Sequence, residues 1–530
     1  MDPNHTTLAE LAAWAPQRYA GSEAIADDVR RIGYTELGEE IDWTAAALVA
    51  AGLQPGDTVA VWAPNIWEWT VAAFATFRAG GVLVPINTRF KGREAAFVLG
   101  KARVKVLFTV NGFLDTDYVA MLAEHRAQLV DLERVVVLRG DVPDGAIGCA
   151  ELLAATTDEH RAEIDRRTAE VRPEDTGLIM FTSGTTGMPK GVMVGHGALI
   201  RAFLAYGEAL GIAEGERMLV INPFFHAFGF NGATVPCLLR GATLVPHAVF
   251  DVDAVLAKIE SERITILPAP PAIFQGLLNH KKLDSFDISS LRSCITGAAP
   301  ISAELVVQMR ERLGFETVLT AYGMTETSGL ATLCSPEDDP ETIANTSGKA
   351  IDGVELRIVD DEGRMVGAGQ PGELLVRGFQ IMKGYLDDPE QTAEAVDADG
   401  WLHTGDVAVM DERGYIDITD RKKDMFIVGG FNAYPAEIER MMIEHPDVGQ
   451  VAVVGVPDER LGEVGAAFVV AAPRSEPDPD HLIRWCRAAI ANYKVPRYVW
   501  VVESLPLNPS NKVLKYALRD MALERIGAAR

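Results

Sequence analysis

Cysteine is scarce in this chain of 530 residues, which contains five cysteines. The number is odd, the positions are scattered, and no C-x-x-C pair occurs. This usage excludes a disulfide framework and a zinc ribbon, and it is typical of small buried residues in a reducing compartment. The five are Cys149, Cys237, Cys294, Cys334 and Cys486.

Positive charge is also in deficit, since 49 lysines and arginines face 75 acidic residues and leave a net charge of −26. An acidic surface repels phosphate backbones and anionic lipids, which argues against nucleic-acid and membrane partners. No apolar run approaches the ~20 residues that span a bilayer. The first residues, MDPNHTTLAELAAWAPQ, lack the basic and apolar regions of a signal peptide. We therefore expect a soluble, cytoplasmic protein; the expected assembly is a monomer or homodimer.

The length is several times that of a common domain of ~100–200 residues, so we expect more than one domain. Through the first four hundred residues, short apolar runs alternate with segments of helical periodicity. This alternation predicts parallel sheets covered by helices, an α/β architecture. Strands are predicted at residues 58–62, 82–86 and 264–267, and helices at residues 66–79 and after an Asp251 or Asp253 cap.

The pattern changes after about Gly353, where short β-rich segments are separated by Asp/Gly turns. A charged stretch, TDRKKDMFIVGGFNAYPAEIE, precedes a compact α+β pattern whose helix begins at Pro435. We predict a large N-terminal domain over residues 1–420, with a β-rich subdomain over about 353–420. A small C-terminal α+β domain is predicted over residues 421–530, with its hinge near Lys423.

The segment FTSGTTGMPKG, Phe181 to Gly191, combines glycines, four hydroxyl side chains and one lysine. Glycines permit close backbone approach, while N–H groups and hydroxyls donate to phosphate oxygens. A Walker P-loop requires a hydroxyl residue directly after its lysine. Here Gly191 follows Lys190, so this is a different kind of phosphate loop. A flexible surface loop is the structural alternative.

The pattern [ST]-G-T-T-G-x-P-K-G resembles the phosphate loop of the adenylate-forming superfamily, which includes acyl-CoA synthetases, peptide-synthetase adenylation domains and firefly-type luciferases. Further motifs of that family follow in order over nearly the whole chain. They are YGMTE at 322–326, TGD at 404–406, RKKD at 421–424, GGFN at 429–432 and NPSNK at 508–512.

The resemblance implies a two-step reaction. A carboxylate attacks the α-phosphate of ATP to give an acyl-adenylate and pyrophosphate, and a thiol then displaces AMP. Because a negative nucleophile approaches a polyanion, cations must gather at this site. By resemblance, Lys190 holds the β- and γ-phosphates, Thr325 and Glu326 bind Mg²⁺, and Lys512 reaches the carboxylate and the α-phosphate.

Nucleotide recognition is likewise implied by the resemblance. Tyr322 stacks on adenine, Asp406 accepts from the ribose hydroxyls, and Arg421 contacts the ribose from the hinge side. The predicted ATP- and AMP-binding set is Thr182, Ser183, Gly184, Thr185, Thr186, Gly187, Lys190, Gly297, Ala298, Ala299, Pro300, Tyr322, Gly323, Met324, Thr325, Asp406 and Arg421.

The second half-reaction depends on the small domain. In the family it rotates about the hinge, here Lys423, and presents one face for adenylation and another for thiol transfer. Gly429, Gly430 and Phe431 are the predicted CoA contacts. Asn511 stands where the family usually has glycine, and asparagine tolerates left-handed backbone angles.

The segment NPFFHAFGF, residues 222–230, matches the family's border of the carboxylate pocket. His226 is predicted beside the acyl carboxylate as a gate or hydrogen-bond donor. No acidic residue occurs between Asn222 and Arg240, which disfavours an amino-acid substrate. Apolar pocket residues are predicted at Phe225, Phe228, Phe230 and Gly232, with plain core packing as the alternative for the aromatic rings.

The function implied is an AMP-forming acid–CoA ligase that uses ATP, Mg²⁺ and CoA. No carrier domain follows Lys512, so we expect free CoA as the acceptor. The stretches GGFNAYPAEIE and VPDERLGEVGAAF resemble actinobacterial CoA ligases for steroid-ring-derived propanoates, which favours a bulky alicyclic, steroid- or terpenoid-derived acid. The alternatives are a fatty-acid or aryl-acid CoA ligase, an enzyme of one half-reaction, and a nucleotide-sensing protein without turnover.

Overall fold

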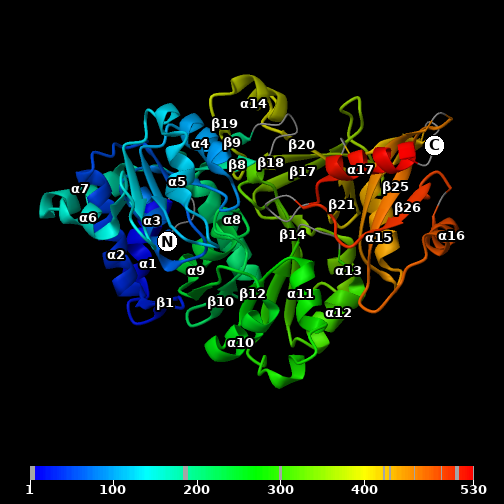
Figure 1. Cartoon of the computed structure of the whole chain (residues 1–530), viewed down its shortest axis with the longest axis horizontal. Helices are drawn as coiled ribbons and strands as arrows, with labels where there is room; N and C mark the ends of the chain where they lie inside the picture. Colours follow the sequence, from blue (N-terminus) through cyan, green and yellow to red (C-terminus); the bar gives the residue numbers. More distant parts are fainter. Residues whose placement is uncertain are drawn as a thin grey trace.

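Two large β-sheets organise the N-terminal lobe (Figure 1). The computed structural model describes residues 6–182, 189–297, 301–421, 424–428, 431–458, 460–490, 492–507 and 513–528. The eight-stranded sheet has the order β19-β9-β8-β4-β3-β5-β6-β7, and the nine-stranded sheet has the order β16-β15-β14-β13-β12-β10-β11-β1-β2. Most neighbours pair in parallel, as the alternating pattern predicts.

The strand bounds of these two sheets follow the apolar runs of the sequence. β3 has the predicted bounds and is buried at every position, because helices cover both faces of the sheet. The eight-stranded sheet contains β3 (Thr58–Trp62), β4 (Val82–Pro85), β5 (Val106–Thr109), β6 (Arg134–Val137), β7 (Ile147–Gly148), β8 (Thr176–Thr182), β9 (Lys190–Gly195) and β19 (Gly384–Tyr385). The nine-stranded sheet contains β1 (Glu23–Ala26), β2 (Arg31–Gly33), β10 (Arg217–Val220), β11 (Thr243–Pro246), β12 (Ile266–Pro268), β13 (Ser293–Thr296), β14 (Thr317–Tyr322), β15 (Thr332–Leu333) and β16 (Lys349–Ala350).

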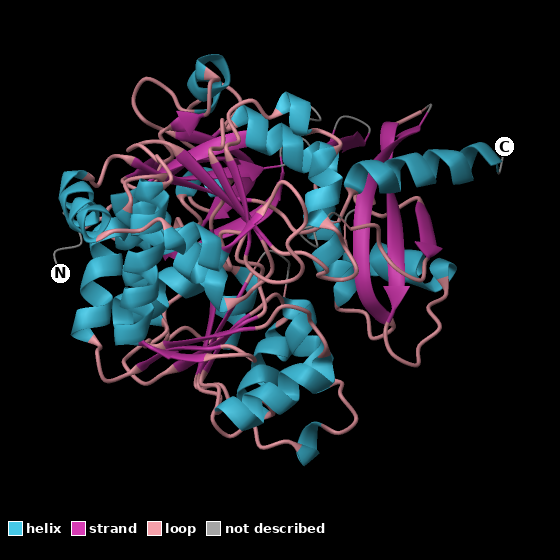
Figure 2. Ribbon diagram, turned by 60° about the vertical axis from the view of Figure 1, so that its left-hand side comes forward, coloured by secondary structure: helices cyan, strands magenta, loops and turns pink. Residues whose placement is uncertain are grey.

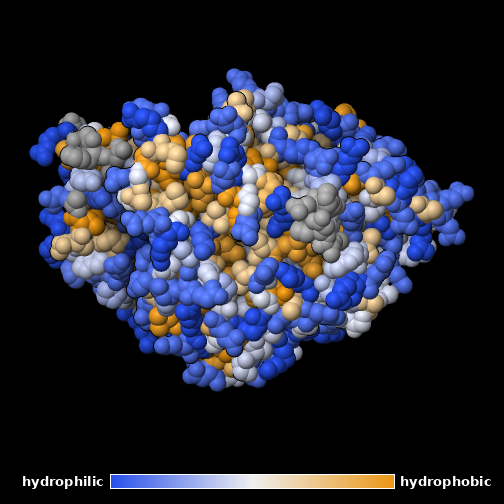
Figure 3. Space-filling model, turned by 180° about the vertical axis from the view of Figure 1, so that it is seen from behind, coloured by the Kyte–Doolittle hydropathy of each residue, from blue (hydrophilic) through white to orange (hydrophobic). Residues whose placement is uncertain are grey.

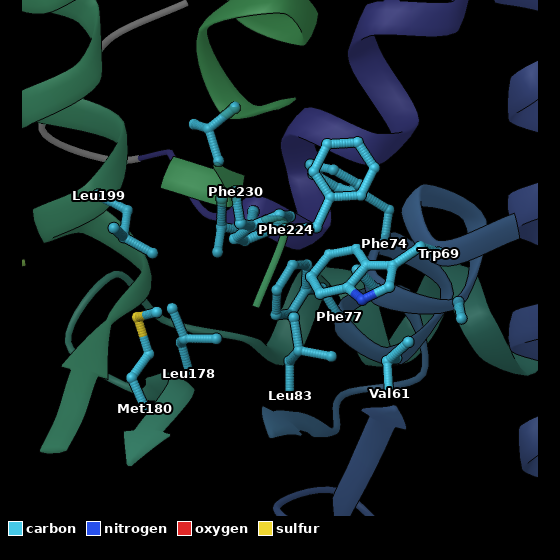
Figure 4. Close-up of a cluster of buried hydrophobic side chains, with 14 of the residues drawn as sticks. Val61, Trp69, Phe74, Phe77, Leu83, Leu178, Met180, Leu199, Phe224 and Phe230 are labelled. Carbon is cyan, nitrogen blue, oxygen red and sulfur yellow. The ribbon is translucent and has the colours of Figure 1, made fainter. Parts of the chain in front are cut away.

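Helices pack between and outside the sheets. Aromatic rings from α3 and from the segment after β10 fill the shared core, where Trp69, Phe74, Phe77 and Phe230 lie together (Figure 4). The helices of the N-terminal lobe are α1 (Leu8–Arg18), α2 (Tyr34–Ala50), α3 (Trp67–Arg78), α4 (Gly92–Lys101), α5 (Tyr118–Ala123), α6 (Cys149–Ala154), α7 (Asp158–Glu170), α8 (His196–Ala209), α9 (Val235–Arg240), α10 (Val252–Glu262), α11 (Pro271–Leu278), α12 (Ala303–Glu311), α13 (Pro340–Asn345) and α14 (Pro389–Ala395).

A four-stranded sheet, called the β-rich sheet below, follows the nine-stranded sheet along the chain and precedes the small C-terminal lobe. Its order is β17-β18-β20-β21, and every pairing is antiparallel. It lies where the sequence predicts a β-rich segment after Gly353. Its strands are β17 (Val354–Val359), β18 (Pro371–Gly378), β20 (Leu402–Met410) and β21 (Ile416–Arg421).

The small C-terminal lobe has its own sheet and its own hydrophobic core, and it lies at one end of the molecule (Figure 2). The fold class predicted from the sequence, α/β followed by a smaller α+β domain, is therefore confirmed. The elements of this lobe are β22 (Phe426–Val428), β23 (Phe431–Ala433), α15 (Pro435–Ile443), β24 (Val448–Asp458), β25 (Gly462–Ala471), α16 (Pro479–Ala489), β26 (Tyr498–Val501) and α17 (Lys515–Ala528).

The molecular surface is mainly hydrophilic at its outer edges. Seen from behind, hydrophobic residues gather toward the middle of the face (Figure 3). Within the described ranges, every helix falls short of the length and apolar character that crossing a bilayer requires.

Candidate active site

Lys190 and Glu326 come together through a tyrosine that the sequence motifs do not include. Lys190 begins β9 and lies opposite Thr182 in the β8–β9 hairpin. Its Nζ atom lies 4.9 Å from the centroid of the Tyr385 ring. The Tyr385 hydroxyl donates a hydrogen bond of 3.0 Å to Oε1 of Glu326. Lys190, predicted to bind the phosphates, and Glu326, predicted to bind magnesium, therefore both contact the Tyr385 side chain.

Tyr385 reaches this position because β19 pairs antiparallel with β9 at the sheet edge. Burial, and then the charge of Glu326, raises the pKa of the Tyr385 hydroxyl above its ordinary value. The hydroxyl consequently stays protonated and acts as a donor to the carboxylate. Glu326 is itself only 7% exposed and belongs to the short 3₁₀ helix Thr325–Thr327.

The predicted nucleotide residues Tyr322 and Asp406 also meet. Tyr322 ends β14, and its hydroxyl donates a hydrogen bond of 2.5 Å to Oδ2 of the buried Asp406 on β20. The backbone of Arg421 on β21 is the register partner of Asp406. Two different sheets thus bring these three predicted residues to one place.

A tight turn follows Tyr322 and sets the direction of the YGMTE motif. A Cβ atom on Gly323 would lie 2.3 Å from the carbonyl oxygen of Gly329, so only glycine fits there. The Met324 carbonyl accepts from the Thr327 amide at 3.0 Å. On the other side, a Cβ on Gly297 would lie 3.3 Å from the Ala321 oxygen, which puts this part of the predicted adenine wall beside β14.

His226 lies in the loop between β10 and a π-helical turn, Phe230–Thr234. Its side chain is half-buried, and its Nδ1 atom accepts a hydrogen bond of 3.1 Å from the Phe228 amide. A neutral ring that accepts at Nδ1 carries its proton on Nε2. This tautomer could donate to a carboxylate, which is the role that the sequence predicts for His226.

The aromatic residues around His226 divide into two groups. Phe225 and Phe228 are half-buried, while Phe230 is fully buried, with its ring centroid 5.2 Å from that of Trp69. For Phe230 the structure favours core packing over a pocket surface. Beside Gly232, a Cβ atom would lie 3.3 Å from Cδ2 of Phe228, so that ring already occupies the space the glycine leaves.

Comparison with known proteins decides the family. The AMP-binding enzyme family matches residues 12–386, and the AMP-binding enzyme C-terminal domain matches residues 437–512. The chain belongs to the AMP-binding enzymes. Its resemblance to the adenylate-forming superfamily is thereby confirmed.

Relatives with assigned activities agree on the reaction. A 7a-methyl-1,5-dioxo-octahydro-1H-inden-4-yl propanoyl:CoA ligase of Rhodococcus jostii is 46% identical over 98% of this chain and 99% of its own length. A ligase of the same name from Mycobacterium tuberculosis is 46% identical over 94% of this chain and 95% of its own. The chain is an acyl-CoA ligase, as predicted.

A solved structure has the same architecture. The crystal structure of the anthranilate CoA ligase AuaEII in complex with anthranoyl-AMP matches with a TM-score of 0.88 at 27% identity. The match covers 99% of each chain, so both lobes of the ligase are included.

Several predicted site residues of the ligase lie outside the described residues, and for two others only the backbone is described. Arg421 belongs to β21 and Phe431 to β23, and their predicted roles rest on the motifs. The residues outside the described ranges are Ser183, Gly184, Thr185, Thr186, Gly187, Ala298, Ala299, Pro300, Lys423, Gly429, Gly430, Asn511 and Lys512.

The oxygen atoms of Thr325 and Glu326 fit the predicted Mg²⁺ in kind. A hydroxyl and a carboxylate are hard ligands, and Mg²⁺ in nucleotide enzymes commonly takes one or two carboxylates together with substrate phosphates and water. Among the described residues of the ligase, no group of three or more His, Cys, Asp or Glu side chains could hold a metal alone. This donor set suits a metal that arrives with a nucleotide.

A pocket of about 180 Å³ opens beside Lys190. It lies between the end of α4, the start of β9 and the β19–α14 turn, and Lys101 adds a second cation to it. Its lining is Phe97, Lys101, Pro189, Lys190, Gly191, Tyr385, Leu386, Asp388 and Gln391.

Proposed function

We propose that this ligase activates a propanoic acid attached to an oxygenated alicyclic ring system and transfers the acyl group to CoA. The observation that carries the proposal is the 46% identity, over 98% of the chain, to a ligase for a dioxo bicyclic propanoyl group. The half-buried Phe225 and Phe228 beside His226 support an apolar acyl site.

In the first step, the acid carboxylate attacks the α-phosphate and pyrophosphate leaves. The Nε2 proton of His226 orients the carboxylate, and Lys190, held over the Tyr385 ring, faces the β- and γ-phosphates. Mg²⁺, when bound by Thr325 and Glu326 with the phosphates, would neutralise their charge. Lys512 completes the cationic site in this proposal.

In the second step, the thiol of CoA attacks the acyl carbonyl and AMP leaves. We assign the approach of CoA to Gly429, Gly430 and Phe431, after the small domain of residues 421–530 has turned about Lys423. We further propose a cytoplasmic location, which the unpaired cysteines support, and a monomer or homodimer.

Two assays with a panel of acids test this function. Carboxylate-dependent exchange of labelled pyrophosphate into ATP reports adenylation, and thioester formation reports the complete reaction. We expect both with bicyclic propanoic acids that carry ring oxygens, and weaker signals with fatty and aryl acids. Higher kcat/KM for fatty or aryl acids would overturn the substrate class.

A synthetic acyl-adenylate separates the half-reactions. If the protein consumes acyl-adenylate and CoA but fails to form adenylate from ATP and acid, it is a thiolation enzyme. If it exchanges pyrophosphate but forms no thioester, CoA is not its acceptor.

A further inference from the structure

Buried polar atoms without a partner lie on the elements around the predicted acyl site. Among the described residues, the Tyr206 hydroxyl, Oδ1 of Asn231 and Oγ1 of Thr234 have no hydrogen-bond partner. Tyr206 is 2% exposed, and the other two are fully buried. Folded proteins rarely leave such atoms unpaired, because the free energy lost on removing a polar atom from water is then not offset by a hydrogen bond. A ligand atom would supply the missing partner.

Contacts lead continuously from His226 to Tyr206. The Phe228 amide donates to His226, and Cδ2 of Phe228 lies 3.3 Å from the Cβ position of Gly232. The Tyr206 hydroxyl lies 3.6 Å from that same position. On α8, the Tyr206 ring packs against Phe203, with their centroids 5.4 Å apart. The unpaired hydroxyl therefore lies beside Gly232, one of the residues predicted for the acyl site.

The Tyr206 hydroxyl is suited to donate. Burial raises the pKa of Tyr206 well above its ordinary value, so the proton remains at neutral pH. Tyr34 provides the contrast, since it is also fully buried but its hydroxyl donates to the carbonyls of Cys237 and Ala242, at 2.9 and 2.8 Å. Burial of a tyrosine here does not by itself leave its hydroxyl unpaired.

We propose that the Tyr206 hydroxyl donates a hydrogen bond to a ring oxygen of the acyl group and so determines specificity for acids with an oxygenated ring. This inference rests on the proposed function. In this proposal the half-buried Phe228 side chain, which packs beside Gly232, must turn aside for the ring of the acyl group to reach the hydroxyl. A site built around a hydrogen bond rejects an analogue that lacks the bonding atom.

Three bicyclic propanoic acids test the proposal: one with two ring ketones and two in which one ketone is replaced by CH₂. With the wild-type ligase, one of the two replacements should lower kcat/KM about tenfold, the effect of one lost hydrogen bond. In Tyr206→Phe that difference should vanish, because the donor is gone. Equal discrimination by wild type and Tyr206→Phe would overturn the proposal.

A matched variant and a stability measurement complete the test. Tyr34→Phe removes a paired buried hydroxyl, so it should lower the melting temperature and leave the wild-type discrimination among the three acids. Tyr206→Phe should melt at or above the wild-type temperature, since its hydroxyl has no partner to lose; a drop as large as that of Tyr34→Phe would contradict the proposal. If wild type activates none of the three acids, the proposed function fails instead.

Discussion

At the residue scale, side chains of the candidate site contact one another although they lie far apart in the sequence. The motifs predict Lys190, Tyr322, Glu326 and Asp406 as site residues, because each stands in a segment of special composition. Tyr385 stands outside the predicted motifs and lies 59 positions from Glu326 along the chain. The sequence motifs do not include Tyr385, because only the fold brings β19 to β9.

The hydrogen bond from Tyr385 predicts a change in metal dependence. Tyr385→Phe removes a donor that orients the buried Glu326 carboxylate. If Glu326 binds Mg²⁺ as proposed, the Mg²⁺ concentration for half-maximal AMP formation should rise roughly tenfold, as is common when a metal ligand loses its supporting bond. The measurement is the initial rate at fixed ATP and varied Mg²⁺.

Tyr415→Phe is the matched control for that variant. Its hydroxyl also donates to a carboxylate, Oδ1 of Asp338 at 2.7 Å, in a different part of the molecule. Its Mg²⁺ dependence should equal that of wild type. A shift of the same size in both variants would refute the role assigned to Tyr385.

His196 predicts a pH dependence of stability. The ring is 2% exposed, its Nδ1 accepts from the Leu8 amide at 3.3 Å, and burial lowers its pKa to about 4 from 6.5. Between these values the unfolded chain binds the proton and the folded chain does not, so stability falls as the pH falls. From pH 7 to pH 5, this group should cost about 2 kcal/mol.

Urea unfolding at both pH values measures this effect. His196→Gln cannot titrate, so the difference in unfolding free energy between the two pH values should be smaller than in wild type by that amount. An unchanged difference would show that His196 does not contribute.

At the element scale, many bounds could be predicted and the strand order could not. β3 has the predicted limits, β17 lies in the predicted β-rich segment, and Asp251 caps α10 by accepting from the Ala254 amide. The strand predicted to begin at residue 264 begins at Ile266, where the pairing of β12 with β13 starts. The pairing of β1 with β11 depends on long-range packing, which local propensity does not determine.

The turn after β14 predicts a strict requirement for glycine. In Gly323→Ala the new methyl group would meet the Gly329 carbonyl at 2.3 Å, so the turn must open. We expect a loss of about 2 kcal/mol in unfolding free energy, and a larger relative loss of adenylation because Glu326 moves with the turn. Gly367→Ala, where a Cβ atom would meet nothing within 4 Å, should change neither. Wild-type stability of Gly323→Ala would contradict this account.

At the scale of the whole molecule, an ion pair joins the small lobe to the β-rich sheet. Arg440 on α15 donates from Nη1 and Nη2 to the two carboxylate oxygens of Asp417 on β21, each at 2.7 Å. The sequence pattern predicts two domains but gives no sign of this pair, because arginine and aspartate are both common surface residues. The pair stabilises one relative orientation of the lobes.

Arg440→Ala should weaken this orientation. For a half-exposed bidentate pair we expect cleavage between the lobes to become about threefold faster in limited proteolysis. Lys494→Ala, which breaks a pair with Glu437 inside the small lobe, is the control and should leave the cleavage rate unchanged. Equal cleavage of wild type and Arg440→Ala would mean that other contacts hold the lobes together.

The pairing of β19 with β9 has a consequence for biosynthesis. Val192 and Tyr385 are neighbours across this edge, so the ring under Lys190 is translated long after the lysine itself. A nascent chain that has not yet emerged past Tyr385 carries Lys190, the proposed phosphate-binding lysine, without the ring it contacts. The ability to bind nucleotide should therefore arise late in synthesis. It requires β19 to pair with β9, and Val192 of β9 precedes Tyr385 by nearly two hundred residues.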